Sequence, residues 1–198
     1  MTTVFIAGSI NVKHLHAKVQ ARMMNIVVGE YAVLVGDADG VDTAIQKFLH
    51  ENGARNATVY CTGDKPRNNV GNWPVHGVTS YHPKGSRAYF TAKDVEMAET
   101  ANVGLMIWDA KSTGTLSNVI ELLSRKKNSL VFLDKEKQFH KVSNIDELEA
   151  LVGRMADADR LKADSKIGLL DRIASLRSRA LQMDILQRAD VAAFSQDD

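Results

Sequence analysis

Three short segments combine glycine with hydroxyl or carboxylate side chains, and each follows an apolar run of the sequence. The segments are Gly8-Ser9, GDADGVD over residues 36–42 and DAKSTGT over residues 109–115. Glycine allows a backbone to approach a ligand closely, and the first amides of a following helix have no partner within that helix. A phosphate or another anion is therefore favoured at such turns.

The strongest signal for an anion site is the segment that opens a helix at residues 112–115. Hydroxyl groups and backbone amides converge there on one point, which suits a phosphate. The same residues can also act as a simple helix cap, and this alternative stays open. We expect the phosphate to contact the four residues Ser112, Thr113, Gly114 and Thr115.

The acidic segment at residues 36–42 suggests a different role. Its three carboxylates, Asp37, Asp39 and Asp42, would repel a phosphate placed among them. They suit ribose hydroxyls, a metal ion or a helix cap, and Asp39 lies near the expected start of a helix. No second cluster of metal ligands accompanies them in the sequence, so we expect neither a metal site nor a bound cofactor.

A long polar loop over residues 62–84 is the third candidate region. Irregular loops of this length are uncommon in compact domains and are usually functional or disordered. Its cations and amides suit a nucleotide phosphate and its indole suits a base, while a mobile surface loop is the alternative. We expect Arg67 and Asn68, with Arg87 in the next helical pattern, to contact the ligand. Other side chains of the loop and of the next helical pattern could face the same ligand cleft, and these are Lys65, Asn69, Asn72, Trp73, His76, Tyr89, Lys93 and Asp94.

Alternating apolar runs and helical patterns must position these segments. Such alternation predicts an α/β fold, a Rossmann-like three-layer sandwich with a five-stranded parallel sheet of order 3-2-1-4-5. Ligands bind such sheets at the carboxyl ends of the strands, beside the point where the strand order reverses. The β-rich runs cover residues 4–10, 31–36, 57–61, 103–108 and 130–133, and the helical patterns cover residues 11–28, 40–51, 86–101 and 115–126.

The sequence changes character after Val152, where β-rich runs end. We therefore expect a nucleotide-binding domain over residues 1–152 and a helical extension over residues 153–198. Apolar residues recur in the extension at helical spacing, so the helix should pack on the core or on a second subunit. We expect it to form a homo-oligomer. The apolar stripe consists of Leu170, Ile173, Leu176, Ala180, Met183 and Leu186.

Composition narrows the function classes. The chain has 198 residues, with 25 Lys and Arg against 24 Asp and Glu, a net charge of +1. Proteins that coat nucleic acid usually carry a basic excess, so nucleic acid is expected to be an unlikely partner. The single cysteine, Cys61, cannot form an internal disulfide, and we expect a reducing, cytoplasmic setting with no membrane partner.

The sequence resembles the SLOG superfamily of Rossmann-like domains over about residues 3–135. The resemblance is carried by IAGS at residues 6–9, by GDADGVDTAIQKFL at residues 36–49 and by KDVEMAETANVGLMIWDAKSTGT at residues 93–115. The superfamily includes YspA/YpsA-like proteins, the LONELY GUY-type phosphoribohydrolases and the DNA-processing protein DprA, and the sequence is most similar to the YspA/YpsA-like branch.

The resemblance implies a nucleotide or a nucleotide-derived ligand, such as a nucleotide sugar, at the strand ends. It implies that residues 112–115 hold phosphate and that the first strand end lines the site. The residues that it assigns to the first strand end and to a second wall are Gly8, Ser9, Gly36, Asp37, Ala38, Asp39, Gly40 and Asp42.

One position departs from the enzymes of this superfamily. The phosphoribohydrolases carry a glutamate three residues after the threonine of their Gly-Thr pair, and Asn118 stands there in this sequence. Asparagine cannot act as a nucleophile or general base, so cleavage at an N-glycosidic or phosphate bond would require Asp39, Asp42 or Asp109. The alternatives are a ligand sensor without catalysis and a DprA-like nucleic-acid binding protein.

Overall fold

The computed structural model describes the backbone of residues 1–194 and the side chains of residues 1–182. Within these residues, seven strands form one sheet in the order β4-β3-β2-β1-β5-β6-β7. Only β7 is antiparallel to its neighbour. The strands are β1 (Thr3–Gly8), β2 (Ala32–Gly36), β3 (Ala57–Thr62), β4 (Val75–Val78), β5 (Val103–Trp108), β6 (Ser129–Leu133) and β7 (Gln138–Val142).

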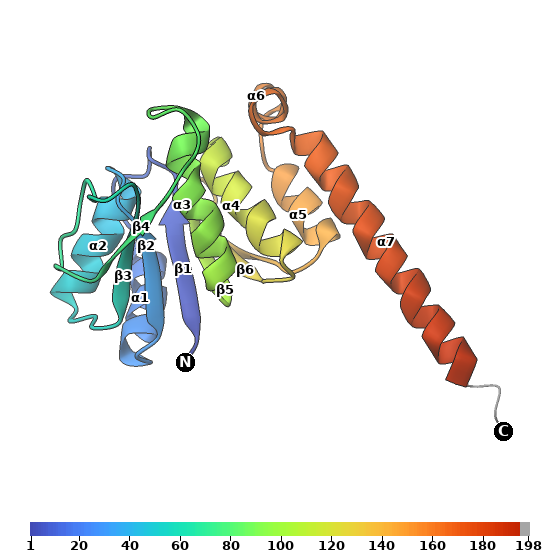
Figure 1. Cartoon of the computed structure of the whole chain (residues 1–198), viewed down its shortest axis with the longest axis horizontal. Coiled ribbons are helices and arrows are strands. Elements are labelled where there is room, and N and C mark those ends of the chain that lie inside the picture. The colour runs from blue at the N-terminus through green and yellow to red at the C-terminus, as the bar shows by residue number, and fades with distance from the viewer. Residues whose placement is uncertain (195–198) are drawn as a thin grey trace.

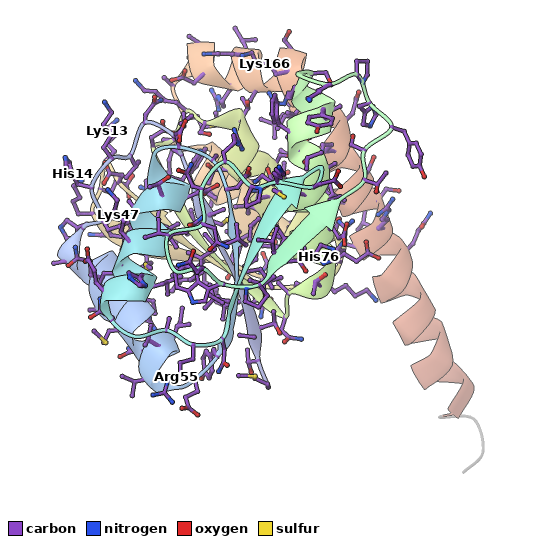
Figure 2. All side chains as sticks on the ribbon, turned by 60° about the vertical axis from the view of Figure 1, so that its left-hand side comes forward. Lys13, His14, Lys47, Arg55, His76 and Lys166 are labelled. Carbon is purple, nitrogen blue, oxygen red and sulfur yellow. The ribbon has the colours of Figure 1, made fainter. Side chains whose placement is uncertain are left out.

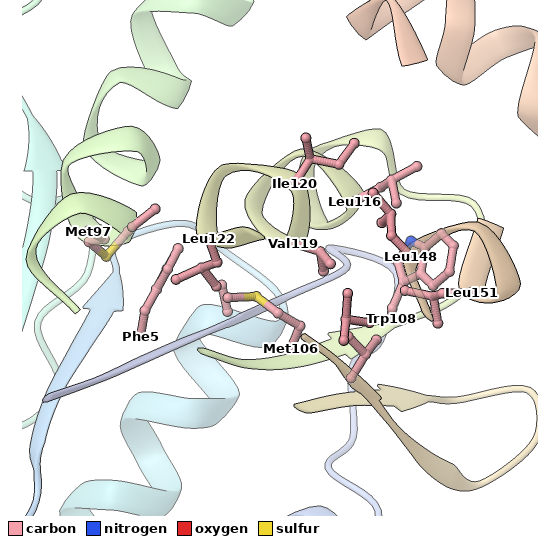
Figure 3. Packing of buried hydrophobic residues seen from close by; sticks show 14 of the residues in the cluster. Phe5, Met97, Met106, Trp108, Leu116, Val119, Ile120, Leu122, Leu148 and Leu151 are labelled. Carbon is pink, nitrogen blue, oxygen red and sulfur yellow. The ribbon is translucent and has the colours of Figure 1, made fainter. Parts of the chain in front are cut away.

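Helices cover both faces of this sheet (Figure 1). Helices α1 (Ala17–Val28) and α2 (Val41–Glu51) pack on one face through one cluster of buried apolar side chains. The other face packs against α3 (Arg87–Thr100), α4 (Thr113–Ser124) and α5 (Ile145–Val152) through a second cluster. Figure 3 shows part of this second cluster. The predicted Rossmann-like α/β sandwich is thus confirmed.

The five central strands have the predicted order, since β3-β2-β1-β5-β6 corresponds to 3-2-1-4-5. The chain crosses from the β4 side of the sheet to the β5 side through α3, so the strand order reverses between β1 and β5. All six parallel strands end at the same edge. This edge therefore brings the turns after β1, β2 and β5 together, as ligand sites of such sheets require.

Two local predictions were wrong, the number of strands and the start of the first helix. The sheet has seven strands rather than five, because β4 lies inside the loop expected to be irregular and β7 forms a hairpin with β6. The first helix begins at Ala17 rather than at Asn11, since the Nδ1 atom of His16 accepts from the Lys18 amide at 3.2 Å and caps it. Val12 is buried without being helical, and its apolar side chain extended the helical pattern.

The C-terminal extension begins as part of the body. It contains α6 (Asp157–Ile167) and α7 (Leu169–Phe194), and Leu169 is buried in the same apolar cluster as Phe5. Beyond its first turns α7 runs away from the body (Figure 1). No helix in the described part of the chain is both long enough and apolar enough to span a membrane.

The apolar stripe of α7 is divided between two environments. Ile173 and Leu176 pack against the core, whereas Leu170 is 64% exposed. Met183 and Leu186 lie outside the described side chains. The domain boundary at Val152 and the homo-oligomer therefore stay predictions.

Candidate functional site

The turns after β1 and β5 meet at Ser9. The Ser9 hydroxyl donates to Asp109 Oδ1 at 3.0 Å, accepts from the Asp109 amide at 3.1 Å and lies 3.3 Å from Thr115 Oγ1. Ser9 is fully buried. Gly8 allows this approach, because a Cβ atom there would lie 2.5 Å from the Ile107 carbonyl oxygen. The structure thus brings together two of the three segments that the sequence singled out, because the Ser9 hydroxyl of the first segment contacts Asp109 and Thr115 of the other.

Asp109 organises the turn that precedes α4. Its carboxylate accepts from the amides of Lys111 at 2.9 Å and Ser112 at 2.7 Å, and from Asn11 Nδ2 at 3.2 Å. Ala110 adopts a left-handed φ of 62°, which folds the backbone back onto this carboxylate. Burial raises the pKa of Asp109, but hydrogen bonds from Ser112 and Lys111 outweigh it, so the pKa lies below its ordinary value. An ionised carboxylate held by these donors is a weak general base.

The N-terminus of α4 has free backbone donors. Ser112 is the N-cap; its hydroxyl accepts from the Thr115 amide at 3.5 Å and its carbonyl accepts from Trp108 Nε1 at 3.0 Å. The amides of Thr113 and Gly114, which begin the helix, have no partner within it. Gly114 is partly exposed, and a Cβ atom there would meet only the Ser112 hydroxyl, at 3.9 Å. A side chain at Gly114 in the first turn of α4 would therefore have room.

A guanidinium group lies at the same helix end. Arg87, the first residue of α3, donates through Nη1 to Thr113 Oγ1 at 2.9 Å. Trp108, the last residue of β5, is 1% exposed and packs beside Leu148 and Leu151 (Figure 3). Its buried indole thus holds the turn before α4 in place through the hydrogen bond to the Ser112 carbonyl.

The acidic segment after β2 contacts the protein's own loop. Arg67 donates through Nη2 to Asp37 Oδ1 at 2.8 Å and through Nε to Asp37 Oδ2 at 3.0 Å. Asn68 Nδ2 donates to the Asp37 carbonyl at 3.0 Å and to Asp39 Oδ1 at 2.9 Å. Burial raises the pKa of Asp37, but the hydrogen bonds from Arg67 outweigh it and the pKa is lowered. Four residues expected to bind ligand therefore bind one another.

A buried charge cluster lies beneath this segment. Lys93 of α3 is 4% exposed, and its Nζ lies 2.8 Å from Asp94 Oδ1 and 4.0 Å from Asp37 Oδ1. Asp42 accepts from the Ala38 amide at 3.3 Å, and burial raises its pKa to about 6. The surrounding carboxylates, Asp94 first, raise the pKa of Lys93 against the effect of its burial. The buried cation of Lys93 depends on these carboxylates, whereas burial makes the ionised form of Asp42 costly even beside Lys93.

Two glycines of the acidic segment serve packing. A Cβ atom on Gly36 would lie 2.6 Å from Lys93 Nζ and closer still to the Asp42 carboxylate. Gly40 has a φ of 83°, and it forms the N-cap position of α2 without a side-chain hydrogen bond. Asp39 therefore does not cap α2. Within the described side chains, no group of three or more His, Cys, Asp or Glu residues is placed to hold a metal ion.

The loop after β3 is anchored rather than open. The buried Gln46 donates to the Gly36 carbonyl at 2.8 Å and accepts from the Val70 amide at 2.9 Å. Trp73, expected to stack on a base, is 8% exposed and donates to the Ala54 carbonyl at 3.0 Å. Phe90 of α3 supplies an exposed ring instead, and it lies 5.3 Å from the Arg67 guanidinium. The sequence carried no signal for it, since a phenylalanine on a helix usually faces the core.

Comparison with known proteins adds a similar fold and no family. No family model matches the sequence, and no curated protein sequence matches it. A solved structure of DNA processing protein A from Helicobacter pylori is similar with a TM-score of 0.47 and 18% identity, over 66% of this chain and 64% of that chain. That protein is DprA, a member of the superfamily that the sequence resembles. Likeness at this level does not tell what this chain binds.

The comparison nevertheless corrects one expectation. The similar protein is described by its binding of single-stranded DNA. This finding stands against the expectation that nucleic acid is an unlikely partner, and that expectation is not retained. It was drawn from the net charge of the whole chain, which does not report where on the surface the cations gather.

Proposed function

We propose that this chain binds a nucleotide or a nucleotide-derived ligand at the carboxyl edge of the sheet, with a phosphate at the N-terminus of α4. The proposal is carried by the start of α4, where the amides of Thr113 and Gly114 have no partner within the helix and the Arg87 guanidinium lies 2.9 Å from the Thr113 hydroxyl. Backbone amides and the helix dipole favour an anion there, and a guanidinium adds charge-assisted hydrogen bonds. The position beside the reversal of strand order supports it further.

We propose binding without catalysis. Asp109 is ionised and engaged by several donors, Asp42 is buried beneath Gly36, and Asp39 is held by Asn68. Asn118, where the phosphoribohydrolases carry a glutamate, is buried on α4. These observations favour a ligand sensor over a nucleotide hydrolase or an N-glycosidase, because each candidate base already serves another contact.

Calorimetric titration with the four mononucleotides tests the proposal. Gly114→Asp should abolish binding, since it adds a negative charge at the anion position. Gly114→Ala is the matched control and should keep the affinity, because the added methyl group meets only the Ser112 hydroxyl. The aspartate should not unfold the protein, since a carboxylate in the first turn of a helix is favourable. Unchanged affinity in Gly114→Asp would contradict the placement.

A single strand of nucleic acid is the second candidate ligand. Arg87 is exposed at the beginning of α3, and the preceding loop holds the exposed Lys84 and Tyr81, which is 98% exposed. Exposed cations and rings together are typical of single-strand binders. The salt dependence of binding distinguishes the two, because the logarithm of affinity for single strands falls with a slope of about 0.7 per neutralised phosphate. A slope above about 2 would favour the strand.

A further inference from the structure

A cleft of about 580 Å³ opens between the end of β3, the loop that follows it and the first turns of α3. Its volume lies in the range of small-molecule sites. Gly63 and Gly85 lie on its walls, and both have a left-handed φ, of 89° and 88°. The residues of the proposed phosphate site at the start of α4, Ser112, Thr113, Gly114 and Thr115, do not line it.

Positive charge dominates the walls of this cleft. Lys65, Arg67, Lys84 and Lys93 line it. Arg67 is paired with the buried Asp37 and Lys93 with Asp94, whereas Lys65 and Lys84 are exposed and form no ion pair with any side chain among residues 1–182. Asp64 is the remaining wall carboxylate that no described cation neutralises. The two free ammonium groups therefore favour an anion in the cleft.

An aromatic ring is fixed at the same place. Phe90 is 41% exposed and meets Tyr89 edge to face, with ring centroids 5.3 Å apart. Tyr89 is itself held, because its hydroxyl donates to the Thr62 carbonyl at 3.2 Å. The Thr62 hydroxyl, also on the wall, is buried and has no hydrogen-bond partner among the described residues. A held, half-exposed ring beside a free hydroxyl suits a planar ligand with polar edges.

The cleft lies next to the proposed phosphate site. Arg87 and Phe90 are three residues apart on α3, so they are neighbours on one side of this helix. Arg87 reaches Thr113 at the start of α4, and Phe90 borders the cleft. One turn of α3 therefore connects the two places.

We propose that the cleft binds a second nucleotide of the ligand, so that the site takes two nucleotides joined by a phosphodiester. The ring of the second base stacks on Phe90, and its phosphate lies between Lys65 and Lys84. A free dinucleotide and a segment of a single strand share this chemistry. The inference rests on the proposed function, which places the first phosphate at α4.

The inference is tested by titrating the full chain with mononucleotides, with 5′-phosphorylated dinucleotides and with oligonucleotides of about ten nucleotides. The wild-type protein should bind a dinucleotide at least about tenfold more tightly than the mononucleotide of the same base. The double variant Lys65→Ala, Lys84→Ala should lose that gain and keep mononucleotide affinity. The matched control removes two exposed lysines elsewhere, Lys47 on α2 and Lys166 on α6 (Figure 2), and should keep the gain.

The ring is tested separately. Phe90→Leu keeps an apolar side chain without a ring and should cost the dinucleotide at least about fivefold in affinity, whereas Phe90→Tyr should not. Oligonucleotides that bind no more tightly than dinucleotides would identify a free dinucleotide as the ligand. Tighter binding of oligonucleotides would identify a strand.

Two results separate this inference from the proposed function. Suppose that mononucleotides bind, that Gly114→Asp abolishes this binding, and that dinucleotides bind no more tightly than mononucleotides. The two-nucleotide site is then wrong and the proposed function stands. If Gly114→Asp leaves mononucleotide affinity unchanged while the lysine variant still loses the dinucleotide gain, the phosphate placement is wrong and the cleft stands. A dinucleotide gain that persists in both the lysine and the Phe90→Leu variants would overturn the inference.

Discussion

Asp42 gives a direct test of the buried charges around Lys93. Replacing Asp42 by Asn removes a carboxylate whose pKa burial raises to about 6 from 3.8, while keeping its size and its ability to accept from the Ala38 amide. A raised pKa means that the folded protein binds the proton more tightly than the unfolded chain. We therefore expect Asp42→Asn to stabilise the protein, and to do so increasingly as the pH rises.

The size of the effect follows from the two pKa values. Below about 3.8 the carboxyl group is protonated in both states, and it then contributes no pH dependence. Between 3.8 and about 6 the unfolded chain loses its proton first, so stability falls as the pH rises. Above about 6 the full difference is present, about 3 kcal/mol at 1.36 kcal/mol per pH unit.

Urea unfolding from about pH 4 to pH 7.5 measures this difference. The stability advantage of Asp42→Asn should grow by more than about 2 kcal/mol over that range. Asp157→Asn is the control, because Asp157 has a side chain that is 88% exposed and its ion pair with Arg160 should contribute little. Parallel pH profiles for the wild type and Asp42→Asn would refute the reasoning, since Asp42 would then titrate alike in both states.

Three further outcomes follow from the same structure. Gly36→Ala should lower stability by about 3–5 kcal/mol in thermal unfolding, because its methyl group would displace Lys93 and Asp42, and Gly114→Ala, with open space, should not. Lys93→Met should cost about 3–5 kcal/mol near pH 7.5 by leaving buried carboxylates without their cation, and adding Asp42→Asn should restore part of the loss; no recovery would show that Asp42 is not coupled to Lys93. Sedimentation should show an oligomer that is lost when the chain ends after Ala180, while a single 21.8 kDa species for the full chain would contradict self-association through α7.

Much of the sheet could be predicted because its central strands have a clear sequence pattern. The central runs are nearly continuous in apolar residues, as strands buried on both faces must be, and their alternation with helices leaves few topologies. The edge strands carry no such signal. β4 reads VHGV between a proline and a polar loop, and three of its four residues are exposed, so only the tertiary pairing with β3 makes it a strand.

The candidate site was predicted less evenly. Ser9, Asp109 and residues 112–115 meet as the strand order requires, since turns after neighbouring parallel strands lie at one edge. The acidic segment was assigned to a ligand because its partner, Arg67, lies 30 residues away in a loop whose path the sequence does not determine. Lys93 was placed near the cleft, but its burial depends on the neighbouring Asp94 and on the acidic segment that holds Asp37 and Asp42, and no local pattern reveals that this segment packs against α3.

The central claim is that a nucleotide phosphate binds the amides at the start of α4. Two-dimensional amide NMR during titration with a mononucleotide tests it most directly, because a new hydrogen bond shifts the amide that donates it. We predict that the largest shifts fall on Thr113 and Gly114, and that Gly114→Asp eliminates them. Saturable binding whose shifts lie elsewhere, with these two amides unmoved, would contradict the account.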